Sequence, residues 1–311
     1  MNDPAHVPVL LEETLQGLGL RADGIYIDCT YGRGGHSGAI LERLADGGRL
    51  LAFDRDAAAV AAARGRFGGD PRFEIVHDSF ATLADVAARR GWAGSINGVL
   101  FDLGVSSPQL DEAQRGFSFL RDGDLDMRFD PRAGQSAADW LNDAPEAEIA
   151  DVLRRLGEER YARRIAGAVV RVRREAPIRR TLELRDLIKR SVPTREREKD
   201  PATRSFLAIR MHVNGELDEL QRALPQALSV LRPGGHLVVI SFHSLEDRLV
   251  KRFMRREASG GDLPADLPIR HADLHPALRV LGRAQRPGEA EVARNPRARS
   301  AVLRVAEKLA A

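Results

Sequence analysis

The sequence has 311 residues, of which 43% are apolar and 30% are charged, the composition of a folded globular protein and not of a disordered one. Its apolar runs are shorter than the roughly 18 residues of a membrane helix, and its N-terminus lacks a basic stretch followed by an apolar block. Cys29 is the one cysteine, which excludes an internal disulfide and a cysteine-rich zinc site. We expect a cytoplasmic protein with no membrane segment.

The net charge is only +3, but it is unevenly distributed. Residues 154–210 carry 18 Lys and Arg against 8 Asp and Glu, whereas the rest of the chain carries 30 against 37. A basic block in an otherwise acidic chain is typical of a protein that binds a phosphate backbone. The alternative is a solvated, arginine-rich helical surface.

The first hundred residues alternate short strand-like runs with helical ones, as in a parallel sheet covered by helices. The expected strands are 25–28, 50–54, 73–76 and 99–102, and the expected helices are 38–44 and 57–66. The fourth strand follows a turn-like stretch at 94–98. This order predicts a doubly wound, Rossmann-like α/β sheet.

Between residues 109 and 217 the sequence shows amphipathic helices and no convincing strand. The clearest helix is 158–174, whose apolar residues recur at helical spacing while arginines occupy the remaining surface. These arginines include Arg163, Arg164, Arg171 and Arg174. A second long helix is expected from 206 to 231, ending at Pro233-Gly234-Gly235.

Strand-like sequence returns at 236–242 and 300–305. The sheet needs these strands to bury its core, which favours an insertion over two domains in series. We therefore expect an α/β domain in two parts, 1–110 and 218–311, interrupted by an all-helical domain at 111–217.

The first strand ends at Asp28 and leads into a glycine-rich turn. A phosphate loop of the ATPase type would end in Gly-Lys-Ser/Thr, but this turn has His36-Ser37. A dinucleotide site wants glycine at the sixth position of G-x-G-x-x-G, where this chain has Ser37. The nucleoside site of methyltransferases has an acid before the glycines, and Asp28 supplies one. Asp28 fits equally well as a carboxylate that caps the turn.

Acidic and aromatic residues also end the next two strands. Asp54 lies about 20 residues beyond the turn, where a carboxylate accepts hydrogen bonds from both ribose hydroxyls. An acid there would repel the phosphate of NADP and tolerate NAD or S-adenosylmethionine. After the third strand, Phe80 is expected against an adenine face and Asp78 against the adenine amine.

The fourth strand ends at Asp102, followed by Ser106-Ser107-Pro108. In this fold the end of strand four faces the reacting methyl group. The amine of cytosine is a poor nucleophile, because its lone pair is delocalised into the ring, so acceptors such as a carboxylate must favour its reactive form. A plain turn is the alternative, since Ser-Ser-Pro is ordinary turn chemistry.

Histidines near the C-terminus need separate consideration. His243 lies before a basic helix, and it is either at the rim of the active site or a structural hydrogen bonder. Ser244 is expected to be the N-cap of that helix, with Asp247 three residues later completing the cap. His271 and His275 are four residues apart, but Pro276 follows at once and no third ligand is near. We therefore expect no metal site.

With these residues in view, the chain resembles the bacterial 16S ribosomal RNA cytosine-N(4) methyltransferases, the MraW family, over almost its whole length. Several of the matching segments are long and contain rare residue combinations. The segments are 6–11, 28–37, 102–111, 115–119 with 125–128, 201–204, 240–250 and 295–300.

The resemblance implies S-adenosylmethionine-dependent methylation of a cytosine amine near the decoding centre of the small ribosomal subunit. By position, it implies a cofactor site formed by Gly34, Gly35, His36, Asp54, Phe80, Asp102 and Gln109. Asp102 is also the catalytic candidate, and the inserted domain, with its arginines, is expected to bind the RNA. Cys29 and Tyr31 stand where other members have glycine and phenylalanine.

The family departs from the usual amine-methylating motif, because no aromatic residue directly follows Pro108. The ring that stacks on a flipped base must therefore come from elsewhere, with Phe117, Phe119 and Phe242 as candidates.

Two other functions compete with this one. An NAD-dependent dehydrogenase is disfavoured, because the sixth-position glycine and an obvious catalytic His, Lys or Tyr set are missing. A non-catalytic RNA-binding protein is disfavoured by the intact acids at the ends of strands one, two and four. The sequence leaves the oligomeric state open.

Overall fold

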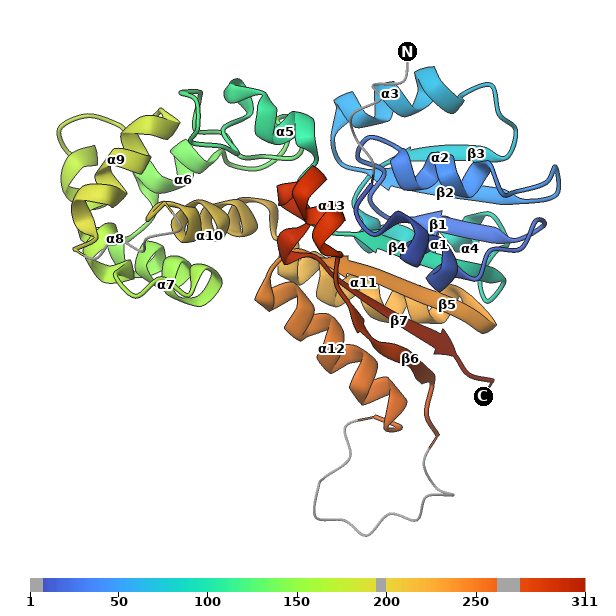
Figure 1. Ribbon diagram of the computed structural model, residues 1–311. Coiled ribbons are helices and arrows are strands. Elements are labelled where there is room, and N and C mark those ends of the chain that lie inside the picture. The colour runs from blue at the N-terminus through green and yellow to red at the C-terminus, as the bar shows by residue number, and fades with distance from the viewer. Residues whose placement is uncertain (1–7, 194–199, 262–274, 311) are drawn as a thin grey trace, which may run out of the picture. The chain divides into compact units, whose positions relative to one another are not determined.

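The computed structural model describes residues 8–193, 200–261 and 275–310. The chain divides into two compact units, one of Met1–Gly104 with Leu217–Ala311 and one of Val105–Glu216. We call them the α/β unit and the helical unit and describe each by itself (Figure 1). The first boundary falls after Gly104, a few residues before the 110/111 boundary that the sequence suggested.

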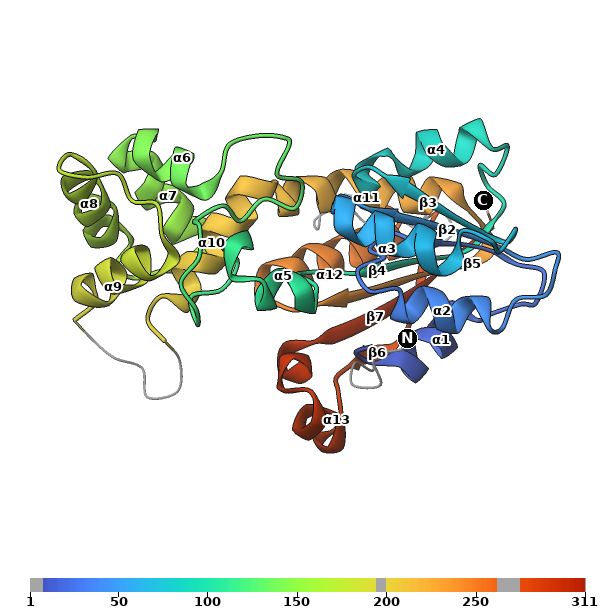
Figure 2. The ribbon, with the colours of Figure 1, turned by 90° about the horizontal axis from the view of Figure 1, so that it is seen from above.

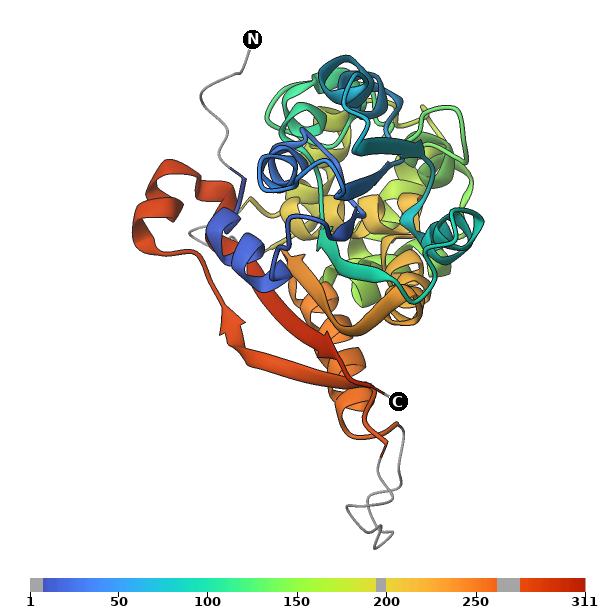
Figure 3. The same cartoon turned by 90° about the vertical axis from the view of Figure 1, so that its right-hand side faces the viewer.

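The α/β unit contains a seven-stranded sheet of order β3-β2-β1-β4-β5-β7-β6. Strands β1 to β5 are parallel, and β7 is antiparallel to both of its neighbours (Figure 3). The predicted doubly wound, Rossmann-like sheet is confirmed. The strands are β1 (Ile25–Asp28), β2 (Arg49–Asp54), β3 (Phe73–His77), β4 (Ile96–Asp102), β5 (Leu231–Ser241), β6 (Leu278–Gln285) and β7 (Val302–Lys308).

Helices cover both faces of this sheet, so its central strands are apolar on both sides. Alternate residues of β1 illustrate this: Ile27 packs in one core with α4, α11 and α12, and Tyr26 packs in the other with α1 and α2. The helices are α1 (Leu11–Leu18), α2 (Gly35–Leu41), α3 (Ala57–Phe67), η1 (Phe80–Thr82), α4 (Leu83–Arg89), α11 (Glu216–Val230), α12 (Ser244–Ala258), α13 (Glu289–Arg294) and η4 (Pro296–Ser300).

Several element boundaries of the α/β unit and at its junction with the helical unit differ from the sequence predictions. Helix α2 begins at Gly35, not at 38, because Gly34 adopts a left-handed conformation at its N-cap. Strand β4 begins at Ile96, within the predicted turn, because it pairs with Leu231 of β5. The predicted helix 206–231 is two helices separated at Gly215, whose φ is 63°. It also ends at Val230, before the proline.

The helical unit has its own hydrophobic core, built from the apolar faces of five helices. Its described part has one isolated β-bridge, between Asp124 and Arg180, and no strand. The predicted helix 158–174 begins only at Ala162, because Glu158 takes a left-handed conformation that ends α7. The helices are α5 (Ser107–Asp111), η2 (Ala113–Arg115), α6 (Ala137–Asp143), α7 (Glu146–Gly157), α8 (Ala162–Arg173), α9 (Thr181–Ser191) and α10 (Thr203–Asn214) (Figure 2).

Within the described residues, no helix of either unit combines the length and the apolar character that crossing a membrane would require.

Candidate active site

The carboxyl ends of the parallel strands lie along one edge of the sheet, where open α/β folds bind ligands. Asp28 ends β1, Asp54 ends β2 and Asp102 ends β4. Strand β1 pairs with β2 on one side and β4 on the other, so the three carboxylates belong to three adjacent strands. The tertiary structure thus brings together three acids that lie far apart in the sequence.

Asp28 organises the glycine turn. Its Oδ2 accepts a 2.6 Å hydrogen bond from the Ser37 hydroxyl, and its Oδ1 accepts one from the Thr30 amide at 3.1 Å. The side chain is buried, and burial raises the pKa of this carboxyl above its usual value. Both oxygens are thus engaged in joining β1 to α2. Of the two roles that the sequence left open, the geometry supports the cap.

The turn itself is shaped by glycines with positive φ. Gly34 has a φ of 69° and stands at the N-cap of α2. A Cβ at this position would overlap with the hydroxyl end of Tyr31. His36 follows in the first turn of α2 and is 5% exposed. Glycine at position 34 therefore lets the Tyr31 ring pack against the turn at the N-terminus of the helix.

Asp54 also holds the turn. Its Oδ2 accepts a hydrogen bond from the Gly32 amide at 2.8 Å, and its Oδ1 accepts one from the Asp56 amide at 2.8 Å. Each carboxylate oxygen can accept a second hydrogen bond, so capacity for ribose hydroxyls is left. Burial, above all, raises the pKa of Asp54 to about 6, despite the two amides.

Asp102 differs from the other two acids because one of its oxygens has no partner. Its Oδ1 is shielded from solvent and accepts no hydrogen bond from the described residues, although 26% of the whole side chain is exposed. Its Oδ2 lies 3.6 Å from His36 Nε2. Burial, with the negative charges of Asp28 and Glu246, raises the pKa of Asp102 to about 8. A carboxylate in this state would gain from a cation or a hydrogen-bond donor.

The end of β3 offers less than the sequence suggested. Phe80 begins η1, and its ring packs edge-on against Phe101 with the centroids 5.4 Å apart. Asp78 is exposed, and its carboxylate accepts hydrogen bonds from the Ser79 amide and the Thr82 hydroxyl. The contact of these residues with an adenine stays a prediction.

The start of α12 corrects one sequence prediction and adds a residue that it missed. The N-cap is His243 and not Ser244. Glu246, not Asp247, completes the cap: it is 2% exposed and accepts hydrogen bonds from the amides of Phe242 and His243. In the sequence, Glu246 could not be distinguished from Asp247 as the capping acid. In the structure, Asp247 accepts a hydrogen bond from the Arg304 side chain instead.

Phe242 is the candidate stacking residue that belongs to the α/β unit. Its ring faces Gly104, two residues after Asp102: a Cβ there would lie 3.5 Å from the ring. The other two candidates have partners inside the helical unit. Phe117 stacks on Phe129 with 5.6 Å between centroids, and Phe119 packs edge-on against Phe206.

In the helical unit, Gln109 is 6% exposed, and its side-chain oxygen accepts a hydrogen bond from the Ser106 amide to cap α5. Its predicted contact with the cofactor remains a prediction. Arg163, Arg164, Arg171 and Arg174, in α8 and at its C-cap, are all exposed. Within the described residues, none of these four forms an ion pair.

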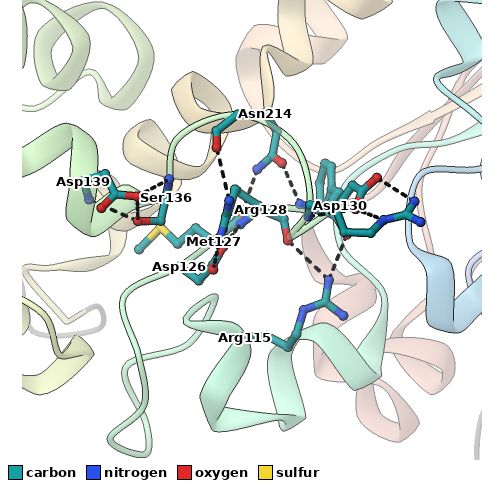
Figure 4. A network of polar contacts seen from close by, with 11 residues as sticks. Arg115, Asp126, Met127, Arg128, Asp130, Ser136, Asp139 and Asn214 are labelled. Carbon is teal, nitrogen blue, oxygen red and sulfur yellow. Dashed lines mark hydrogen bonds and ion pairs between the residues drawn. The ribbon is translucent and has the colours of Figure 1, made fainter.

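A polar network ties together two of the segments that carry the family resemblance (Figure 4). Met127 is buried with a φ of 64°, a strained conformation for a residue with a side chain. Its amide donates to the Arg115 carbonyl, and its carbonyl accepts from the Asn214 side chain at 2.7 Å. Asn214 also accepts from the Phe129 amide. Asn214, which the sequence analysis missed, therefore helps to hold this strained turn.

Comparison with known proteins identifies the family of this chain. Residues 3–309 match the model of the MraW methylase family. The chain is 59% identical over 308 residues to ribosomal RNA small subunit methyltransferase H of Thioalkalivibrio sulfidiphilus, which covers 99% of this chain and 98% of that protein.

Two solved structures show weaker likeness. A putative rRNA-methylase from Clostridium thermocellum is 12% identical, with a TM-score of 0.46 over 98% of this chain and all of that one. A putative methyltransferase from Streptococcus mutans, in complex with SAH, is 14% identical, with a TM-score of 0.43 over the same shares. The assignment follows from the family model and the curated relative, because these structural scores are too low to add to it. The chain belongs to the MraW methylase family.

Proposed function

We propose that this protein transfers a methyl group from S-adenosylmethionine to the exocyclic N(4) amine of a specific cytosine in 16S ribosomal RNA, near the decoding centre of the small subunit. Family membership and the name of the 59% identical relative support the reaction class and the substrate. The structural observation that carries the proposal is Asp102, a carboxylate with an unpartnered, shielded oxygen at the end of β4. The protein acts in the cytoplasm on the small subunit.

The charge of the site fits S-adenosylmethionine better than a dinucleotide. Burial is the main cause of the raised pKa of Asp54 and of Asp102, and the negative charge of Asp28 adds to both, so the acids at this edge oppose one another's ionisation. A ligand with a positive sulfonium relieves that repulsion, whereas the pyrophosphate of NAD increases it. In this proposal Gly34, Gly35 and His36 border the cofactor and Asp54 accepts from its ribose. Phe80 completes the part of the pocket that lies in the α/β unit.

When bound, S-adenosylmethionine supplies a methyl group on a sulfonium that is already a good leaving group. The protein therefore has to position the amine and remove one proton. Methyl transfer forms the nitrogen–carbon bond, breaks the sulfur–carbon bond and releases one proton from the amine. In our proposal Asp102 Oδ1 accepts a hydrogen bond from the amine N–H, favours the nucleophilic form of the amine and takes up the proton that the amine loses. A nearby positive charge lowers the pKa of Asp102, so the carboxylate is ionised when it is needed.

The proposal assigns RNA binding to the helical unit. The exposed arginines in and next to α8 have charges that no acidic side chain of the described residues neutralises. Such charges bind phosphates and release counterions from the RNA.

One experiment tests the proposed function. The protein is incubated with labelled S-adenosylmethionine and small subunits from cells that lack this methylation, and the modified nucleoside is identified and mapped. We expect label in one N(4)-methylcytidine of 16S RNA. Fully methylated subunits are the control and should take up no label. Label in another nucleoside, or tighter binding of NAD than of S-adenosylmethionine, would reject the proposal.

A further inference from the structure

The connection between β6 and β7 is a second arginine-rich segment, and it belongs to the α/β unit. We call residues 286–301 the arginine arm. Its acids are Glu289 and Glu291, and the side chain of Glu291 is already engaged by the Leu10 amide at 2.8 Å. Its arginines, all exposed, are Arg286, Arg294, Arg297 and Arg299. The surface of the arm is therefore mainly basic.

The arm is a built structure. The Asn295 side chain accepts a hydrogen bond from the Arg297 amide and so caps η4. Ala298, between the two exposed arginines of η4, is fully buried in the core that contains α1 and α2. Arg297 and Arg299 are thus held on a short helix that is anchored by the residue between them. Their backbone is therefore fixed before a ligand binds, so binding costs only the freedom of the two side chains.

Sheet topology places the arm beside the active site. Strand β6 runs parallel to β5, because both are antiparallel to β7, so the arm leaves β6 and enters β7 at the carboxyl edge of the sheet. Asp102 of β4 pairs with Ile240 of β5, which pairs with Leu303 of β7. The backbones of Asp102 and Leu303 are therefore two strand spacings apart, a distance of about 10 Å.

The arm also adjoins the glycine turn through the segment before α1. Glu291 of α13 binds the backbone of Leu10, so α13 lies beside the start of α1 (Figure 3). Pro8, two residues earlier, lies so close to Gly35 that a Cβ on this glycine would overlap with the proline ring. The arm therefore flanks the edge at which both the cofactor and the target base would lie.

We propose that the arginine arm binds the backbone phosphates of the RNA next to the cytosine whose amine reaches Asp102. This inference rests on the proposed function. A base that leaves its stack to reach an active site carries its own phosphates with it, and these must be held nearby. Guanidinium groups bind phosphate oxygens through paired hydrogen bonds. An acidic protein surface is the competing partner, and the arm's position beside the reacting edge favours RNA.

The test measures binding of undermethylated small subunits without S-adenosylmethionine, at several salt concentrations. Two double variants, Arg297→Gln with Arg299→Gln and Arg286→Gln with Arg294→Gln, should each weaken binding at least about tenfold, because each removes two charged hydrogen-bonding groups. The slope of log affinity against log salt should decrease by about 1.4 for two lost contacts to single-stranded RNA. Arg297→Lys with Arg299→Lys should keep the wild-type salt slope but lose part of the affinity, because lysine keeps the charge and not the paired hydrogen bonds.

The matched control is Arg64→Gln with Arg89→Gln. These two exposed arginines lie in α3 and α4, at the other end of the sheet. This control and both arm variants should keep the wild-type melting temperature and affinity for S-adenosylmethionine. If the arm variants bind subunits as tightly as the control, or lose affinity with an unchanged salt slope, the proposal is wrong. Because binding is read without methyl transfer, wild-type protein that binds subunits but methylates no cytosine would contradict only the proposed function.

Discussion

At the scale of single residues, the carboxyl edge contains three acids with different environments. Asp28 uses both oxygens within the turn, and Asp54 uses one lone pair of each oxygen. Asp102 keeps one oxygen without a partner among the described residues. The residue whose hydrogen bonding is least satisfied is thus the one that we propose acts on the substrate.

Replacing Asp102 with asparagine tests that role. Asp102→Asn keeps the shape and one acceptor oxygen but removes the charge. We expect the single-turnover rate at saturating cofactor to fall about 100-fold or more, as for the loss of a positioned proton acceptor. The dissociation constant for S-adenosylmethionine should change much less, because the interaction is made mainly in the transition state. A full single-turnover rate with weakened cofactor binding would make Asp102 a cofactor ligand only.

The same residue predicts how stability depends on pH. Burial raises the pKa of Asp102 from its ordinary value of 3.8 to about 8, so the folded protein retains a proton that the unfolded chain loses in acid. That contribution is fully present below pH 3.8 and is lost as the pH rises through about 8. Asparagine does not titrate. We therefore expect the melting temperature of wild-type protein to fall relative to that of Asp102→Asn across this range.

Calorimetry from about pH 5 to about pH 9 measures this difference. Asp78→Asn is a suitable control. It replaces an exposed carboxylate that follows β3, a strand of the same sheet that is not adjacent to β4. The difference between Asp102→Asn and wild type should grow with pH, and the control should show no such trend. A difference that is constant with pH would mean that Asp102 is ionised throughout.

At the scale of elements, helix α8 separates its apolar and basic functions by face. Ile165, Ala166 and Val169 pack in the core of the helical unit. Arg163, Arg164 and Arg171 are exposed to solvent. Because those arginines contribute nothing to the core, their replacement should leave the fold intact. Their effect on RNA can thus be measured without a loss of stability.

Replacing Arg163, Arg164, Arg171 and Arg174 with glutamine should weaken binding to the small subunit and flatten its salt dependence, since fewer counterions are released. Affinity for S-adenosylmethionine should stay at the wild-type value, because these side chains belong to the other unit. Binding titrations at several salt concentrations check both. An unchanged salt slope would assign these residues to an ordinary solvated surface.

At the scale of the whole molecule, each unit has its own hydrophobic core. The chain crosses between the units at two places, after Gly104 and after Glu216. Units with separate cores can unfold separately, so a ligand that binds one unit does not have to stabilise the other against unfolding.

Hydrogen exchange can test this independence. S-adenosylmethionine should slow amide exchange at the glycine turn, residues 29–38, and leave exchange in α7 and α8 unchanged. Protection follows the unit whose folded state binds the ligand. In Asp54→Ala the protection should be lost at the same ligand concentration. Equal protection of both units would show that the cofactor couples them.

Much of the fold and part of the site could be predicted from the sequence. The alternation of apolar runs with helical ones gave the parallel strands, and the acids that end them are local features of each run. Helix ends were harder to predict. Gly215 and Glu158 end helices through left-handed conformations, and either residue is compatible with a continuous helix in a sequence pattern.

The sequence by itself determined the sheet, the three acids at strand ends and the resemblance to the family, because these depend on short-range patterns. Only the tertiary structure decided which acid keeps a free oxygen and that His36 lies 3.6 Å from Asp102. It also decided that residues near 300 flank the same edge as residues near 30. These facts depend on pairing between distant strands and on burial, and burial is a property of the whole packed unit, which no local pattern encodes.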